Sequence, residues 1–157
     1  MSQKELWEME EQSRLKELEK KAEELFNGQE ISPDKLNKRS GEENKEVLDS
    51  PGVYLWLTTK NNKVMYVGRT GKEERVTLRK RLQQHLHKNK KMSGQPIQKW
   101  LREKENLEDS EKASNWMKDN LVIRAIPMRD PKNRMLLESY LIAKYAPEVN
   151  LCKSKEH

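Results

Sequence analysis

The sequence predicts an α/β fold of the α+β type, with a helical extension at the N-terminus. Three short segments rich in β-branched and aromatic residues, 53–59, 64–67 and 121–126, predict strands. The longer segments around them carry apolar residues every three or four positions, which is typical of helices. With 157 residues and an apolar content of 33%, the chain suits one domain with a small core and an appendage.

Charge is distributed unevenly along the chain. Residues 1–49 hold 9 Lys or Arg against 14 Asp or Glu, a net charge of −5, whereas residues 50–157 hold 23 against 12, a net charge of +11. A basic segment of this length favours a polyanionic partner, because neutralised phosphates release their condensed counterions. The alternative is a lysine-rich surface that only keeps the protein soluble.

The sequence carries no membrane or disulfide signal. No apolar run is long enough to span a bilayer, and the acidic N-terminus lacks the pattern of a signal peptide. Cys152 is the single cysteine, so no internal disulfide can form, and no Cys/His cluster has the spacing of a zinc site. We therefore expect a soluble, cytoplasmic protein.

The first 49 residues are expected to form an acidic helix and a linker. Residues 2–26 lack Gly and Pro and predict a helix with an apolar stripe along its second half. This stripe consists of Leu15, Leu18, Ala22 and Leu25. It either docks against the domain or forms a short coiled-coil seam, through which residues 1–26 self-associate or bind a partner. The polar composition of residues 29–50 predicts a linker, with a short helix beginning at Pro33 and a domain boundary near Asp49.

The first two predicted strands form a hairpin around a polar Lys-Asn-Asn-Lys turn. Because side chains alternate between the faces of a strand, the length of the loop decides whether Tyr54 and Tyr66 share a face. A two-residue loop at Asn61 and Asn62 places them on opposite faces. A three-residue loop with a left-handed Asn and a bulge places them on one face, and we expect this arrangement.

A helix is predicted over residues 77–88, where leucines recur every four positions. Arg81 and His85 are also four residues apart and border the leucine stripe, so both are expected at the edge of the buried face. Taken alone, His85 has the alternative interpretation of a surface histidine.

A further helix is predicted from Asp130 to Tyr145, followed by an irregular or extended stretch that holds Asn150. Glu138 shares a face of this helix with apolar residues, where a carboxylate needs a cation or a metal as its partner. The alternative is an ordinary salt bridge, for which Arg134 is available one turn earlier.

The order of these residues resembles the GIY-YIG nuclease superfamily. The tripeptides 52–54 (GVY) and 66–68 (YVG) match the two that name the family, and an Arg, a His, a Glu and an Asn follow in the family order. These four residues are Arg81, His85, Glu138 and Asn150. The resemblance covers residues 51–152. It implies a three-stranded antiparallel sheet flanked by helices, with the catalytic side chains gathered on one face.

The resemblance also implies a chemistry, namely divalent-metal-dependent hydrolysis of DNA phosphodiester bonds by an endonuclease that uses a single metal ion. Glu138 is implied as the ligand of one Mg²⁺ or Mn²⁺, which keeps much of its hydration. Arg81 is expected to bind the scissile phosphate, and His85 to support or share the proton transfer. Tyr54 is expected to be the general base that activates water, with Tyr66 positioning the water or phosphate. The assignment between the two tyrosines stays open.

Several residues are implied in supporting roles. Arg69 matches a place where some relatives carry a basic residue that contacts phosphate. Gly52 and Gly68 are expected to let strands approach closely, and Asn150 to hold the site together through hydrogen bonds. The acidic pair 73–74 is expected on the surface, without a second metal.

Compared with compact relatives, residues 88–119 look like a basic helical insertion into the nuclease-like domain, which is predicted to span residues 50–157. Lys88, Lys90 and Lys91 are expected to contact DNA there, although a charge run also suits a solvated face. RNA as a substrate is left open. The alternative functions are a non-catalytic nucleic-acid-binding module and an interaction protein that acts through its N-terminal helix.

Overall fold

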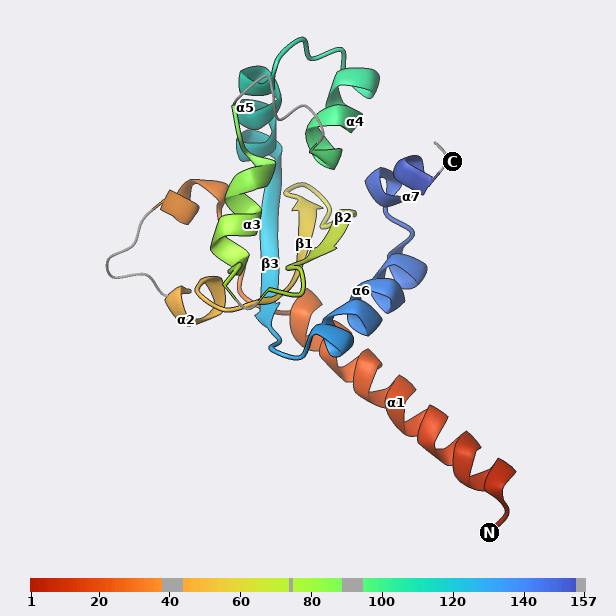
Figure 1. Ribbon diagram of the computed structural model, residues 1–157. Coiled ribbons are helices and arrows are strands. Elements are labelled where there is room, and N and C mark those ends of the chain that lie inside the picture. The colour runs from red at the N-terminus through yellow and green to blue at the C-terminus, as the bar shows by residue number, and fades with distance from the viewer. Residues whose placement is uncertain (38–43, 74, 89–94, 155–157) are drawn as a thin grey trace.

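The computed structural model describes residues 1–37, 44–73, 75–88 and 95–154, except for the side chains of residues 153 and 154. It has the predicted α+β fold, in which helices flank a small sheet (Figure 1). In chain order the elements are α1 (Gln3–Phe26), a 3-10 helix η1 (Pro33–Asn37), α2 (Lys45–Leu48), β1 (Gly52–Thr58), β2 (Val64–Arg69), α3 (Leu78–His85), α4 (Pro96–Lys104), α5 (Ser110–Asn120), β3 (Leu121–Pro127), α6 (Pro131–Tyr145) and α7 (Glu148–Ser154). None of the described helices is both long enough and apolar enough to cross a bilayer.

The three described strands form the predicted antiparallel sheet, and their order in it is β2-β1-β3. The central strand β1 is buried on both faces because its side chains alternate between two apolar clusters. Tyr54 and Trp56 lie in the cluster covered by α3, α4 and α5, whereas Val53, Leu55 and Leu57 lie in the cluster covered by α6 and the end of α1. The tyrosine face of the sheet therefore looks toward α3.

The hairpin has the predicted left-handed Asn and bulge but a longer loop. Asn62 has φ 53°, and the pairing register shifts between Trp56 and Leu57. The backbone N–H of Thr58 donates to the carbonyl of Lys63 (2.9 Å), so four residues form the loop, one more than predicted. The bulge compensates for this extra residue, since Tyr66 pairs with Trp56 and thus shares its face with Tyr54.

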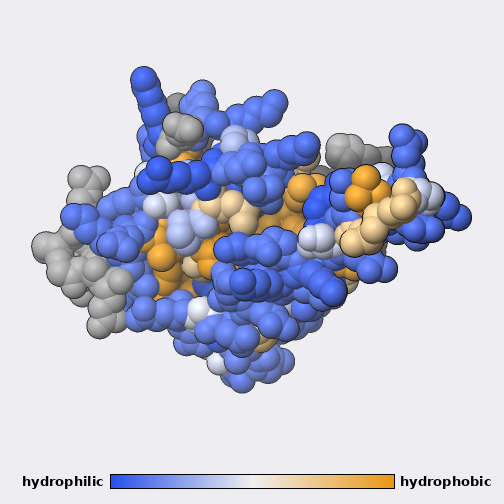
Figure 2. Space-filling model, turned by 90° about the horizontal axis from the view of Figure 1, so that it is seen from below, coloured by the Kyte–Doolittle hydropathy of each residue, from blue (hydrophilic) through white to orange (hydrophobic). Residues whose placement is uncertain are grey.

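Helix α1 docks through its C-terminal end and projects away from the domain for most of its length (Figure 1). Ala22 and Leu25 are buried against Leu137 and Leu141 of α6, which confirms docking for the second half of the predicted stripe. Leu15, at the start of the stripe, is 47% exposed. Seen from below, the molecule is mostly hydrophilic, with hydrophobic residues showing in limited areas between polar ones (Figure 2).

The described parts of segment 29–50 pack against the sheet and do not form the linker that composition predicted. Ile31 forms an antiparallel bridge with Ile123 of β3, and Leu36 and Leu48 are buried in the core. A few apolar residues in a polar segment suffice for this, because each fills a site on the tyrosine face of the sheet. The division of the chain near Asp49 stays a prediction.

The C-terminal stretch is helical, so the prediction of an irregular or extended segment was wrong. Ala146 adopts a left-handed conformation (φ 44°) that ends α6, and Pro147 accepts the first backbone hydrogen bond of the next turn, from Leu151 (3.1 Å). The Ala-Pro pair thus separates two helices and does not end helical structure. Asn150 therefore lies on α7, next to the buried Val149.

Candidate active site

The two tyrosines lie side by side on the sheet, at different depths. Their ring centroids are 6.3 Å apart, and both rings pack against the imidazole of His85. Tyr54 is fully buried, and its hydroxyl is 2.6 Å from Nε2 of His85. Tyr66 is 7% exposed and reaches a surface pocket. Only the second tyrosine of the pair can therefore meet a ligand directly.

Helix α3 carries Arg81 and His85, with Thr77 as its N-cap. Arg81 is half-buried and reaches the same pocket as Tyr66, where its Nη1 donates to Gln84 (3.1 Å). His85 lies one turn further along, fully buried behind the tyrosines. Burial and the nearby Arg81 lower the pKa of His85 to about 3, so the imidazole is neutral at physiological pH.

The pocket that these residues border has a volume of about 490 Å³. It is lined by Tyr66, Arg69, Gly71, Lys72, Glu73, Val76, Arg81, Gln84 and Glu138. These residues come from β2, the turn after it, α3 and α6. Four residues predicted for the site are thus brought together, whereas Tyr54 and His85 lie behind the pocket wall.

Glu138 is held at the pocket by Arg69. The Nε atom of Arg69 donates to Oε1 of Glu138 at 3.1 Å, and the Glu138 side chain is 23% exposed. Arg134, the alternative partner, is fully buried and donates to the carbonyl oxygens of Thr70, Gly71, Met128 and Arg129. Arg134 thereby fixes the turn after β2 that forms one wall of the pocket.

The donor set suits a hydrated divalent cation. Among the described residues no three His, Cys, Asp or Glu side chains cluster in the manner of a protein metal cage. Mg²⁺ does not need such a cage, since it keeps several waters and takes one or two carboxylates plus a substrate phosphate oxygen. Glu138 and the exposed Glu73 are the two described carboxylates that line the pocket.

Burial sets the protonation of both phenols. Burial raises the pKa of Tyr54, the neighbouring Tyr66 raises it further, and the charge of Arg81 opposes both. The pKa of Tyr66 is also raised, first by burial and then by the negative charge of Glu138, and Arg81 again opposes the shift. The two phenols are therefore protonated at neutral pH unless more positive charge enters the pocket.

The glycines and Asn150 support this arrangement. A Cβ atom on Gly68 would lie 2.4 Å from the Tyr54 ring, and one on Gly52 would lie 2.0 Å from the carbonyl oxygen of Ile126. Asn150 pairs with both backbone groups of Val67, accepting from its N–H (2.9 Å) and donating to its carbonyl (3.0 Å). The side chain thus caps the free edge of β2 beside Tyr66.

Some predicted contacts fall elsewhere, and some pocket residues were not predicted. Lys88 is exposed but does not line the pocket, and Lys90 and Lys91 lie outside the described residues. Lys72 and Gln84 were not predicted. The sequence indicates both residues only weakly. Lys72 follows the Arg-Thr-Gly turn, and Gln84 is three residues after Arg81 on the same helix face.

A comparison with family models identifies a domain in this chain. The model of the GIY-YIG catalytic domain matches residues 50–151, a segment that contains every residue lining the pocket. No curated protein and no solved structure matches the chain significantly.

Proposed function

The chain belongs to the GIY-YIG family of nuclease catalytic domains, and we propose that it is a divalent-metal-dependent endonuclease that hydrolyses DNA phosphodiester bonds. The observation that carries this proposal is the convergence of Tyr66, Arg81 and Glu138 on one pocket. A phenol, a permanent cation and a carboxylate are the groups that hydrolysis of an anionic diester needs for water activation, charge stabilisation and metal binding.

In this proposal Glu138 holds one Mg²⁺ or Mn²⁺. The bound ion would supply Lewis-acid stabilisation of the phosphate oxygens and a more acidic water. Arg69 orients the Glu138 carboxylate through their ion pair and adds positive charge beside the phosphate. Arg81 binds the scissile phosphate, because a guanidinium stays charged at any working pH and offers several N–H hydrogen-bond donors in one plane.

We propose Tyr66 as the general base, in place of the initial expectation of Tyr54. Tyr66 lines the pocket, whereas the Tyr54 hydroxyl is buried and engaged with His85. The negative charge of Glu138 is the second cause of the raised pKa of Tyr66, so a cation bound there would favour the phenolate. Tyr54 then becomes a support for the ring of Tyr66.

His85 is proposed as a positioning residue that supports proton transfer without exchanging protons with solvent. Its ring contacts both tyrosines and its Nε2 atom engages the Tyr54 hydroxyl. A neutral, buried imidazole of this kind holds the two phenols in place.

The test is cleavage of supercoiled plasmid with Mg²⁺ or Mn²⁺. We expect Glu138→Gln to lower the rate by at least ~100-fold, since a charged metal ligand and an electrostatic group are lost together. The matched control is Glu111→Gln, an exposed helical glutamate that does not line the pocket, which should cut like the wild type. Equal cutting by the wild type and Glu138→Gln, or by neither, would contradict the proposal.

Two comparisons refine the test. Tyr66→Phe should lose more activity than Tyr54→Phe if Tyr66 is the base, and the reverse order would restore the role to Tyr54. Duplex RNA offered in place of DNA tests the choice of substrate. Salt-dependent binding without cleavage, unaffected by Glu138→Gln, would instead identify a non-catalytic nucleic-acid-binding module.

Self-association through residues 1–26 stays a prediction, as does a cytoplasmic location. Within α1, the exposed apolar residues Leu6, Trp7 and Met9 are the candidates for contact with a second copy, because the C-terminal end of the helix is already docked. Sedimentation of the full chain beside its Leu6→Glu/Trp7→Glu variant tests this. The same mass for both would leave the helix without that role.

A further inference from the structure

A second pocket, which we call the flank pocket, lies between α2 and α3. Its volume is about 500 Å³, and it is lined by Lys45, Asp49, Thr77, Arg79, Lys80 and Gln83. Arg79 belongs to this pocket and Arg81 to the active-site pocket. Side chains two positions apart on an α-helix differ by roughly 200° in direction, as Arg79 and Arg81 do. The two pockets therefore lie on opposite flanks of α3.

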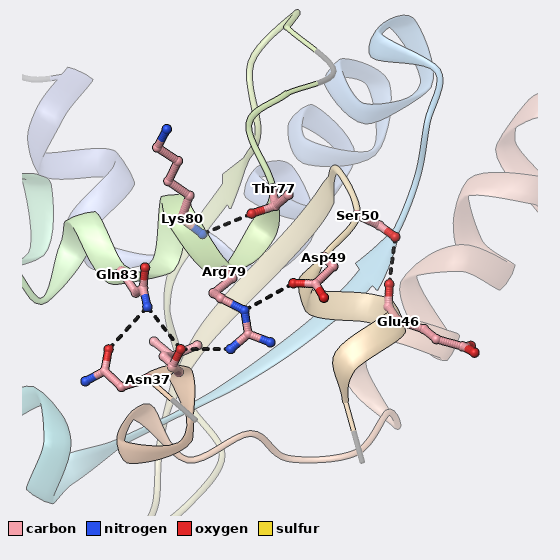
Figure 3. Close-up of polar contacts among 9 residues, drawn as sticks. Asn37, Glu46, Asp49, Ser50, Thr77, Arg79, Lys80 and Gln83 are labelled. Atoms are coloured by element: carbon pink, nitrogen blue, oxygen red, sulfur yellow. Dashed lines mark hydrogen bonds and ion pairs between the residues drawn. The ribbon is translucent and has the colours of Figure 1, made fainter. Parts of the chain in front are cut away.

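The floor of the flank pocket is built from satisfied polar groups. Arg79 is 6% exposed, and it donates from Nε to Asp49 (3.2 Å) and from Nη1 to the carbonyl of Leu36 (2.8 Å). Gln83 donates to the same carbonyl (3.0 Å) and to Oδ1 of Asn37 (3.2 Å). Figure 3 shows Arg79 between Asp49 and the backbone beside Asn37. The Asp49 carboxylate is thus compensated by a buried guanidinium.

The remaining charge of the flank pocket is positive. Lys45 and Lys80 are exposed, and neither forms an ion pair with any residue that the structure describes. The lining contains three cations and one carboxylate, whereas the active-site pocket contains three cations and two carboxylates. Figure 3 shows the Lys80 side chain extending away from the Arg79–Asp49 pair. Its ammonium group is therefore available to an anion.

The exposed edge of α3 connects the two pockets. Going around the helix from Arg81, the side chains of Gln84, Lys80 and Gln83 follow at successive angles before Arg79 is reached. All three are polar, and only Lys80 among them is charged. A strand of nucleic acid can therefore cross α3 without meeting an acidic side chain on the helix itself.

We propose that the flank pocket binds a second backbone phosphate of the nucleic acid that the active site cuts. A helix with its side chains is about 10–12 Å wide, and phosphates follow one another by ~3.4 Å of axial rise per strand, so this phosphate lies roughly three nucleotides from the scissile one. Lys45 and Lys80 bind it through their charge. The flank pocket then determines which phosphate lies at the active site and how short a substrate can be. It takes no part in the hydrolysis itself. This inference rests on the proposed nuclease function.

The test measures binding of a fluorescein-labelled 20-base-pair duplex by anisotropy, in EDTA to prevent cleavage, between 50 and 200 mM NaCl. The Lys45→Ala/Lys80→Ala double variant should lower the magnitude of the slope of log Kobs against log salt by about 0.9, because one phosphate contact is lost, and each single variant should lower it by part of that amount. Lys80→Arg should keep the wild-type slope because it keeps the charge. The control is Lys60→Ala, an exposed lysine in the hairpin loop that lines neither pocket.

Cleavage over a range of DNA concentrations separates this inference from the proposed function. With Mg²⁺, the double variant should need a higher DNA concentration for half-maximal cleavage, because both lysines contribute to substrate binding, whereas Lys60→Ala should cut like the wild type. A double variant with the same salt slope as Lys60→Ala would overturn the flank pocket, even if the wild type cuts DNA. A wild type that binds with the expected slopes but cuts nothing would instead refute the nuclease proposal alone.

Discussion

His85 should make the protein sensitive to acid in a way that one substitution can isolate. The pKa of this buried imidazole is lowered from 6.5 to about 3, chiefly by burial and then by Arg81. Between these two values the unfolded chain takes up a proton that the folded chain excludes. The contribution of the neutral, buried His85 to the free energy of unfolding is therefore fully present above pH 6.5. It is lost progressively as the pH falls toward 3. The expected slope is about 1.4 kcal/mol per pH unit.

The assay is urea unfolding of the wild type and His85→Gln at pH 7.5 and pH 4.5. Other groups also titrate, so the informative quantity is the difference between the two proteins. Between pH 7.5 and pH 4.5 the free energy of unfolding of the wild type should fall by about 2–3 kcal/mol more than that of the variant. This figure follows from the slope above, because the interval reaches two pH units below 6.5. His87→Gln is the matched control, since His87 is exposed two residues away. Parallel pH profiles for wild type and His85→Gln would refute a neutral, buried His85.

Two further predictions concern the support of the site. Gly68→Ala places a Cβ 2.4 Å from the Tyr54 ring and should lower the free energy of unfolding by ~2 kcal/mol, which lowers the melting temperature by about 4–8 °C. A Cβ on Gly71 meets nothing within 4 Å, so the control Gly71→Ala should leave the melting temperature unchanged. Equal melting of both variants would show that the Tyr54 ring can move aside. Asn150→Ala removes both hydrogen bonds to Val67 and should cost about 1–3 kcal/mol, with faster amide exchange at Val67; an unchanged exchange rate would deny the edge-capping role.

Local signals predicted the elements that position the site. The β-branched runs marked all three strands, and the Asp-Pro pair at 130–131 marked the start of α6, where Asp130 accepts from the backbone N–H of Lys132 (3.0 Å). The expected bulge placed both tyrosines on one face. These features depend on neighbours in the sequence, and they were predictable for that reason.

Features that depend on distant contacts were not predictable. The depth of Tyr54 is set by helix α3 packing over it, and spacing along β1 carries no such information. Segment 29–50 reads as a linker because its few apolar residues have no period, yet Ile31 pairs with a strand more than ninety positions later. The ion pair of Glu138 with Arg69 likewise joins α6 to β2, and the spacing of residues along α6 carries no information about it.

Strand β2 shows how several supporting residues act on one side chain of the candidate site, Tyr66. Among the strands that the structure describes, β2 pairs with β1 alone, and an unsupported edge strand is free to pair elsewhere or to move. Asn150 supplies on the open side the donor and acceptor that a fourth strand would supply. On the tyrosine face, Gly68 leaves the space that the Tyr54 ring fills, and that ring packs against Tyr66. Tyr66 is thus fixed from two directions, as the general base proposed for this pocket requires.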